Sequence, residues 1–146
     1  LAGSYVESGL IARELRDVGS SAQIIGTDAL VTEEYGIAAK EAADGTLMTF
    51  TFDPRKFPAA RSALERFRQA DYGAEGFTLY AYAAVQAWVR AVEATGTTDG
   101  PRVAEWLRGG NRVATVTGDI GFDQKGDLVN PRVAWFKWID GRYAEI

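Results

Sequence analysis

The sequence contains no histidine and no cysteine among its 146 residues. A Ser-His-Asp triad, a Cys-His pair and a histidine-ligated zinc are therefore excluded. Without cysteine the chain also has no thiol catalysis, no thiolate metal site and no disulfide. The compartment stays open, because a periplasmic or secreted protein without disulfides is as compatible with this composition as a cytosolic one.

Excess positive charge and long apolar runs are also missing. The chain has 16 Lys and Arg against 20 Asp and Glu, a formal net charge of −4. Nucleic-acid binding needs a clustered basic face, so no nucleic-acid partner is predicted. Arg61, Arg66 and Arg68 lie close together, but Glu65 interrupts them and a solvated helix face is the simpler interpretation. No run of about 18 apolar residues occurs, so no membrane-spanning helix is predicted.

Apolar strands alternate with amphipathic helices along the chain. Helices are expected near residues 6–18, 33–43, 59–69, 77–94 and 101–108, and strands near 22–26, 46–52, 113–116, 132–139 and 142–146. Asp140-Gly141 between the last two strands is a strong hairpin signal. The longest helix carries Tyr80, Ala84, Trp88 and Val92 at four-residue spacing, and Phe77, Ala81, Val85 and Ala91 widen the apolar surface, which indicates a helix packed on more than one side. The alternation indicates an α/β protein with a mostly parallel sheet.

The opening segment, Leu1 to Ser4, is typical of the end of a strand that runs directly into a helix. It is too short for an ordinary strand, and neither an initiator Met nor a signal peptide precedes it. We therefore expect the chain to begin in the middle of a fold. In open α/β sheets the turn from strand to helix is also where ligands bind.

Catalytic and metal-binding motifs are not found. Neither G-x-G-x-x-G nor G-x-x-x-x-G-K-[ST] occurs, and no pattern selects a catalytic pair among the carboxylates, so no enzyme and no cofactor are predicted. The acidic residues of segment 118–127 suggest a calcium-binding loop, but they are four residues apart and Lys125 lies among them, which does not fit such a loop. The alternative is a tight turn in which Gly126 takes a positive φ and Asp123 bonds the backbone. No metal site is predicted.

Three residues are better placed for binding. Tyr5 follows the opening strand, Asp28 follows the strand at 22–26, and Phe77 begins the longest helix. Strand ends and helix starts face the same crevice in doubly wound folds. A phenol, a carboxylate and an aromatic ring around one cleft would suit a small, partly apolar ligand with an ammonium group. Each residue also fits an ordinary structural role, at a core edge, in a turn and as a helix staple.

A succession of segments in one order carries a family resemblance. These segments are Gly3 through Gly19, Ile25-Gly26-Thr27-Asp28, Ala43 through Thr49, Gly76 through Trp88, Gly121 through Leu128, and Trp135-Phe136-Lys137-Trp138. Their order resembles the C-terminal portion of the periplasmic branched-chain amino-acid-binding proteins, the solute receptors of ABC transporters. The resemblance implies parts of two doubly wound parallel-sheet α/β lobes, the type I periplasmic binding fold, incomplete in this chain. By resemblance, residues 1–49 belong to the second lobe, 50–131 to the first, and 132–146 return to the second.

The resemblance also implies roles for the three candidate residues. Tyr5 and Asp28 match residues that hold the α-ammonium of the ligand, and Phe77 matches an aromatic residue that lines the side-chain pocket. The groups that hold the ligand carboxylate belong to an N-terminal portion that is absent from this sequence. Asp28 stands where the family often has Glu, so leucine-like, aromatic or polar amino acids and amides all remain open as ligands.

The function implied by the resemblance is that of an extracytoplasmic amino-acid receptor. Its partners would be a small amino acid and the membrane permease of an ABC transporter. Its location would be the periplasm, or the outer face of a single-membrane bacterium with a membrane anchor. The alternatives are a ligand-sensing domain with the same fold and a small flavodoxin-like enzyme.

The resemblance to only part of a receptor leads to one further expectation. With half of each lobe missing, strands would lack neighbours and apolar helix faces would lie open. We expect that these residues need the missing N-terminal portion, or self-associate, and do not act as an independent monomer.

Overall fold

The computed structural model describes residues 3–146. The chain divides into two compact units. Unit 1 comprises Leu1–Asp53 and Arg132–Ile146, and unit 2 comprises Pro54–Pro131. The chain therefore passes between the units twice, once at Asp53-Pro54 and once at Pro131-Arg132.

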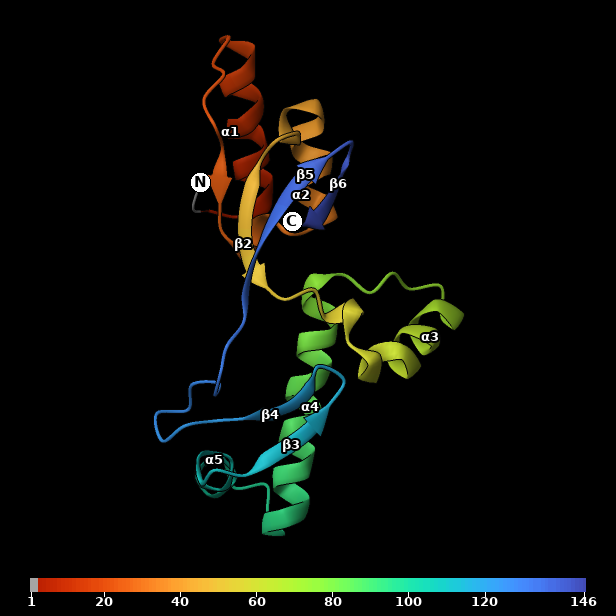
Figure 1. The fold of residues 1–146 in the computed structure, drawn as a ribbon, viewed down its shortest axis with the longest axis vertical. Coiled ribbons are helices and arrows are strands. Elements are labelled where there is room, and N and C mark those ends of the chain that lie inside the picture. The colour runs from red at the N-terminus through yellow and green to blue at the C-terminus, as the bar shows by residue number, and fades with distance from the viewer. Residues whose placement is uncertain (1–2) are drawn as a thin grey trace. The chain divides into compact units, whose positions relative to one another are not determined.

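Unit 1 is a four-stranded sheet with helices. Its elements are α1 (Tyr5–Asp17), β1 (Ile25–Gly26), η1 (Asp28–Leu30), α2 (Glu33–Ala39), η2 (Lys40–Ala43), β2 (Leu47–Thr51), β5 (Val133–Ile139) and β6 (Arg142–Glu145). The strand order is β1-β2-β5-β6. Figure 1 shows the two longest strands, β2 in yellow and β5 in blue, running side by side although they are far apart in the sequence.

The expectation of a mostly parallel sheet is wrong for the strands of this chain. Only β1 and β2 pair in parallel among the described residues, whereas β2–β5, β5–β6 and β3–β4 are antiparallel. Consecutive strands with a helix between them do form one parallel pair here, from β1 through α2 to β2. After β2, however, the chain enters unit 2, so the helices that follow do not bridge strands of the same sheet.

The core of unit 1 lies on one face of this sheet. Met48, Phe50, Phe136 and Trp138 alternate with more exposed neighbours along β2 and β5 and are all buried. The Trp138 indole N–H donates to the Leu30 carbonyl at 3.2 Å. Its ring packs against Gly36 of α2 so closely that an added Cβ there would lie 2.4 Å from Cη2 of the indole. Because Gly36 has no side chain, the Trp138 ring packs directly against α2 and holds this helix on the sheet.

Tyr35 extends this buried cluster. Its ring centroid lies 5.8 Å from that of Trp138, and its hydroxyl hydrogen-bonds the buried Thr46 hydroxyl at 2.9 Å. Burial raises the pKa of the Tyr35 phenol above its ordinary value. Helix α1 packs on α2 through a second close approach, where a Cβ on Gly9 would lie 2.6 Å from the Ala38 Cβ.

Unit 2 is mainly helical. Its elements are η3 (Pro54–Lys56), η4 (Pro58–Ala60), α3 (Arg61–Gln69), α4 (Gly76–Thr95), α5 (Gly100–Arg108), β3 (Arg112–Thr115) and β4 (Gly118–Gly121). Helix α4 contacts α5, β3 and η3. The core cluster contains Ala60, Ala63, Leu79, Ala83 and Val116.

Of the broad apolar surface predicted for the longest helix, Ala91 is the one fully buried member. Along α4 the buried positions are Leu79, Ala83, Ala87 and Ala91, one residue earlier than the predicted row that starts at Tyr80, whose Trp88 is 47% exposed. The sequence places apolar residues on several faces of α4, so periodicity alone does not identify the face that unit 2 covers. In the described residues, that face is the one made of small side chains.

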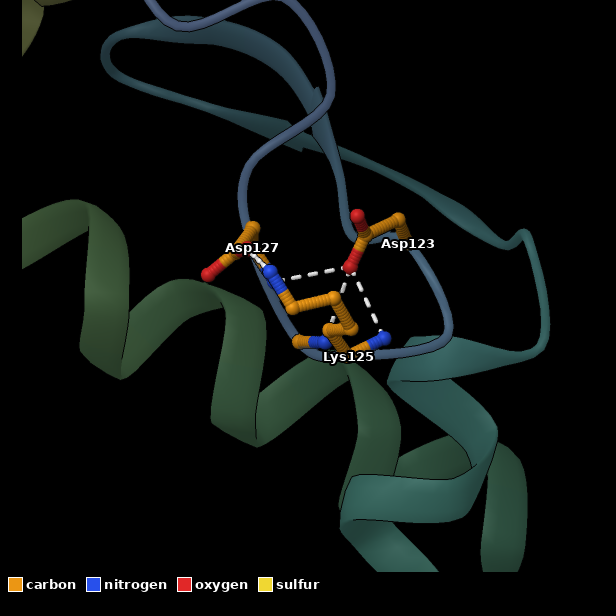
Figure 2. A network of polar contacts seen from close by, with 4 residues as sticks. Asp123, Lys125 and Asp127 are labelled. Atoms are coloured by element: carbon orange, nitrogen blue, oxygen red, sulfur yellow. Dashed lines mark hydrogen bonds and ion pairs between the residues drawn. The ribbon is translucent and has the colours of Figure 1, made fainter.

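The glycine-rich segment after β3 contains a strand that the sequence did not predict. Gly118–Gly121 forms β4 and pairs with β3 in a hairpin. The loop that follows is a tight turn, which is the interpretation that the sequence favoured over a calcium site. The Asp123 carboxylate accepts the backbone N–H groups of Lys125, Gly126 and Asp127 at 2.9–3.0 Å, as Figure 2 shows. Gly126 has a φ of 96°, which a residue with a side chain rarely adopts.

Most other elements agree with the sequence within a few residues. The Asp140-Gly141 hairpin is confirmed, with φ values of 51° and 77°. The strand expected at 22–26 shortens to Ile25–Gly26, and the Ala22 carbonyl accepts a hydrogen bond from the Arg16 side chain of α1. Of the strand end expected at Leu1–Ser4, the first two residues lie outside the described residues, and the remaining two are not in a strand.

Candidate functional site

Tyr5 and Asp28 both belong to unit 1 and both begin a helical element. Tyr5 is the first residue of α1 and is 41% exposed. Asp28 is the first residue of η1 and follows the carboxyl end of β1 after a single residue, Thr27. Its side chain is exposed, while Leu30 at the other end of η1 is buried and anchors the turn. Both side chains are therefore accessible to solvent in unit 1.

The helices that carry these two residues are neighbours. Helix α1 contacts η1. After α1 the chain turns back and returns through β1 toward the end of unit 1 at which α1 begins (Figure 1). A phenol and a carboxylate at neighbouring helix starts offer two oxygen acceptors to a cationic group.

Phe77 belongs to unit 2. It is the second residue of α4 and is 48% exposed, next to Gly76, which is buried. The preceding Glu75 backbone N–H donates to the Thr78 hydroxyl at 3.2 Å, which fixes the first turn of the helix. The structure thus brings Tyr5 and Asp28 into one unit and places Phe77 in the other.

Other ionisable groups in unit 1 have structural roles. The first turn of α2 holds Glu33 and Glu34, where the helix dipole favours anions. The Thr32 hydroxyl donates to the Glu34 carboxylate and lowers its pKa below the ordinary value. Within residues 3–146, no three or more His, Cys, Asp or Glu side chains gather in a way that could hold a metal ion.

A groove of about 620 Å³ runs along α4 in unit 2. It is lined by apolar side chains with polar ones beside them: Ala81, Val85, Val89 and Ala114, with Thr78, Tyr82, Gln86, Arg90 and Glu93. Arg90 and Glu93 form an exposed ion pair at 3.0 Å. None of the three candidate residues lines this groove.

One polar contact of interest was missed by sequence reasoning. The Glu145 carboxylate on β6 accepts the backbone N–H of Asp53 at 3.2 Å, at the point where the chain leaves unit 1. The two residues are 92 positions apart, so no local pattern could have joined them.

The comparisons with known proteins agree on one family. Residues 7–142 match the periplasmic binding protein family. The chain is 40% identical over 144 residues to a Leu/Ile/Val-binding protein homologue of Brucella suis, and 42% identical over 144 residues to a second homologue of Brucella abortus. Both matches cover 97% of this chain and 39% of the relative. The chain therefore spans about two fifths of the length of these curated relatives.

Solved structures show the same fold. A leucine-binding protein from Thermotoga maritima matches with a TM-score of 0.87 at 24% identity, covering 99% of this chain and 42% of that chain. A branched-chain amino-acid binding protein from Streptococcus pneumoniae, in complex with isoleucine, matches with a TM-score of 0.77 at 23% identity, covering 99% and 43%. Within the described residues, no helix combines the length and the apolar character needed to cross a bilayer. The chain belongs to the periplasmic binding protein family and has part of the type I periplasmic binding fold, as the resemblance of its segments predicted.

Proposed function

We propose that this chain is part of an extracytoplasmic receptor that captures a branched-chain or related amino acid for an ABC transporter. The observation that carries the proposal is the identity of about 40% to Leu/Ile/Val-binding protein homologues, which extends through nearly the whole chain. In this proposal the receptor lies in the periplasm or on the outer face of a single-membrane bacterium. It delivers its ligand to a membrane permease and catalyses no reaction.

The two units correspond, in this proposal, to parts of the two receptor lobes. Residues 1–49 and 132–146 contribute to the second lobe and residues 50–131 to the first. The division of the chain at Asp53-Pro54 and Pro131-Arg132 supports this assignment. Tyr5 and Asp28 then hold the ligand ammonium from the second lobe, and Phe77 contacts the ligand side chain from the first.

Charge pairing makes removal of the Asp28 carboxylate more costly to ligand binding than removal of the Tyr5 hydroxyl. When a ligand is enclosed, its ammonium group loses water and needs a paired carboxylate. Removing one partner of a buried ion pair costs about 3–5 kcal/mol, which is about two to four decades of affinity. The Tyr5 hydroxyl is neutral and contributes one ordinary hydrogen bond, worth about 1 kcal/mol.

Calorimetry with leucine on a receptor-length protein that carries this chain tests the ammonium site. Asp28→Ala should lower leucine affinity by about two to four decades. Asp17→Ala, which removes an exposed carboxylate at the last residue of α1, serves as the matched control and should leave it unchanged. Isocaproate, which is leucine without its ammonium group, should bind poorly to the unsubstituted protein. Unchanged affinity in Asp28→Ala, or tight binding of isocaproate, would contradict the assignment.

The uncovered face of the unit 1 sheet supports the second part of the proposal, that this chain functions within a longer receptor. One face of β2 and β5 is buried, whereas the other carries Val133 (74% exposed) and Trp135 (47% exposed), with Ile25 of β1 (50% exposed). Sheets of doubly wound proteins are covered on both faces. We assign the covering layer to the remainder of a receptor of the relatives' length, of which this chain spans 39%.

The isolated chain and its surface variants test this assignment by light scattering. We expect the unsubstituted 146-residue chain to self-associate, and Val133→Ser with Trp135→Ser to shift it toward monomer, because the apolar face is removed. Val18→Ser is the control, since Val18 is as exposed (77%) but lies beyond the end of α1. A monomeric chain that unfolds cooperatively and binds leucine would overturn the assignment without affecting the ligand class.

A further inference from the structure

Both passages between the units leave unit 1 from adjacent strands. Thr51 at the end of β2 pairs with Val133 at the start of β5, and this is the last pair of their ladder. Residues 52 and 53 then lead out of unit 1, and residue 132 leads back in. The two passages therefore start from one point on the sheet.

Two contacts hold these strands together beyond the ladder. The Arg132 guanidinium carbon lies 5.6 Å from the centre of the Phe52 ring, a cation–π arrangement that joins the two passages. The Asp53 backbone N–H donates to the Glu145 carboxylate at 3.2 Å, and Asp53 is only 8% exposed. Glu145 lies on β6, which pairs with β5 on the side opposite to β2, so its side chain reaches across β5 to the first passage.

The first passage is stiff for reasons that combine at Asp53. A hydrogen bond to a carboxylate is about twice as strong as one between neutral groups. The residue before a proline is restricted to extended conformations, and the ring of Pro54 fixes its own φ. Pro54 is fully buried and begins η3 at once. Little backbone freedom is left between β2 and unit 2.

The second passage has fewer constraints. Asn130 and Pro131 are exposed and belong to no helix or strand. Asn130 has a φ of 61°, a left-handed conformation that asparagine adopts more readily than most residues. Pro131 fixes its own φ and restricts Asn130 before it, as Pro54 does for Asp53, but Pro131 is exposed whereas Pro54 is fully buried. The two passages thus differ in stiffness, and the difference depends on a side chain from β6.

We propose that Glu145 is a positioning residue that clamps the backbone of Asp53 in the first passage and thereby restrains changes in orientation between the units. The inference deepens the proposed receptor function, in which two lobes close around a ligand, and concerns how that motion is confined. Glu145 touches no ligand in this proposal. It acts by holding the backbone of Asp53.

The clamp can be tested locally by amide hydrogen exchange of the 146-residue chain, followed by NMR. Glu145→Ala should raise the exchange rate of the Asp53 N–H by about tenfold or more, because the charged acceptor is lost. Glu145→Gln keeps an acceptor oxygen without the charge and should give a smaller increase. Glu14→Ala, at an exposed position of α1, is the control and should leave Asp53 unchanged.

Distance measurements between the units test the consequence. Since the chain has no cysteine, single cysteines at Ile37 in unit 1 and Ala94 in unit 2, both exposed, can carry spin labels without background. Dilution with unlabelled chain removes the distances between labels on different copies. Glu145→Ala should broaden the distance distribution, while Glu14→Ala should not. The clamp is overturned if Asp53 exchange is unchanged, if exchange rises equally at Phe50 and throughout β2 and β5, or if the distribution keeps its width. Neither readout involves a ligand, so failure here is distinct from failure of the receptor function.

Discussion

The two units of this chain fill their cores in different ways. Among the described residues, the five largest fully buried side chains lie in unit 1: Trp138, Tyr35, Phe136, Leu30 and Met48. The Trp138 ring fits against Gly36 of α2. In unit 2 the buried cluster is Ala60, Ala63, Leu79, Ala83 and Val116, and Leu79 is its largest fully buried side chain. Phe57, Leu64, Phe67 and Tyr82 pack against this cluster and are only partly buried. The core of unit 1 thus contains fully buried aromatic rings, whereas the rings of unit 2 stay at the edge of a core of smaller side chains.

Both units leave large apolar side chains on the surface. Unit 2 leaves large apolar side chains of α4 exposed, among them Val85 (61%), Trp88 (47%) and Val89 (39%). In unit 1 the exposed apolar residues of the sheet lie on the face opposite to the aromatic core. Burial of apolar area stabilises a fold by about 25 cal/mol per Å². The buried cluster of unit 2 contains smaller side chains than the aromatic core of unit 1, so we expect unit 2 to gain less from its core and to be the less stable of the two.

The largest expected effect of a single substitution is at Leu79. Leu79→Ala removes the one large aliphatic side chain that is fully buried between α4 and its neighbours, which should cost about 3 kcal/mol. Hydrogen exchange followed by mass spectrometry should show faster exchange in peptides from α4, β3 and η4. Peptides from β2 and β5 should keep their protection if each unit is stabilised by its own core.

Val85→Ala is the matched control on the same helix. Val85 lines the groove and is exposed, so its truncation should change stability by no more than about 0.5 kcal/mol. Loss of protection in unit 1 after Leu79→Ala would break the comparison, because it would mean that the two cores do not act separately.

The sequence predicted helices and hairpins better than it predicted the sheet. The Asp140-Gly141 hairpin and the five α-helices follow from local signals, namely turn residues, caps and periodicity, so they were found within a few residues. The pairing of β2 with β5 joins residues more than 80 positions apart, and no local pattern encodes it. The expected parallel sheet failed for this reason.

Amphipathic patterns also proved ambiguous where a helix is apolar on several sides. The apolar surface predicted for α4 included Trp88, whereas the buried row is Leu79, Ala83, Ala87 and Ala91. Alanine contributes little to a hydrophobic pattern, yet its small size permits the closest helix packing. A sequence pattern that scores only apolar area therefore assigns the larger residues to the buried face of the helix.

The candidate site was predictable only in part. Phe77 was expected at the start of the longest helix and is the second residue of α4. Tyr5 was expected at the end of a strand and Asp28 in a turn, whereas they begin α1 and η1. Their roles toward a ligand come from the family resemblance and stay predictions. The contact between Glu145 and Asp53 depends on tertiary structure, and no sequence signal reveals it.

A smaller effect is expected at Gly36, where the interlocking of unit 1 can be tested directly. Alanine is more favourable than glycine in a helix by about 1 kcal/mol, so Gly36→Ala would stabilise an isolated α2. In the folded unit the added Cβ would lie 2.4 Å from Cη2 and 2.6 Å from Cζ3 of Trp138. The indole is held by its hydrogen bond to Leu30 and by Tyr143, 5.6 Å away between ring centroids, so it has little room to move. Overpacking of this kind costs about 1–3 kcal/mol, and we expect a net loss of about 1 kcal/mol.

Chemical denaturation monitored by near-ultraviolet circular dichroism measures this loss, and two controls isolate its cause. Gly100→Ala, at the first position of α5 with no atom within 4 Å of the added Cβ, should be neutral or slightly stabilising. Repeating Gly36→Ala in a Trp138→Phe background removes the atoms that clash, so the substitution should there become neutral or stabilising. If Gly36→Ala stabilises the unsubstituted chain as well, the Trp138 indole moves at little energetic cost to accommodate the added methyl group. A core that depends on the shape of its rings cannot accommodate an added methyl group without a loss of stability. A stabilising Gly36→Ala would therefore mean that unit 1 is packed no more tightly than unit 2.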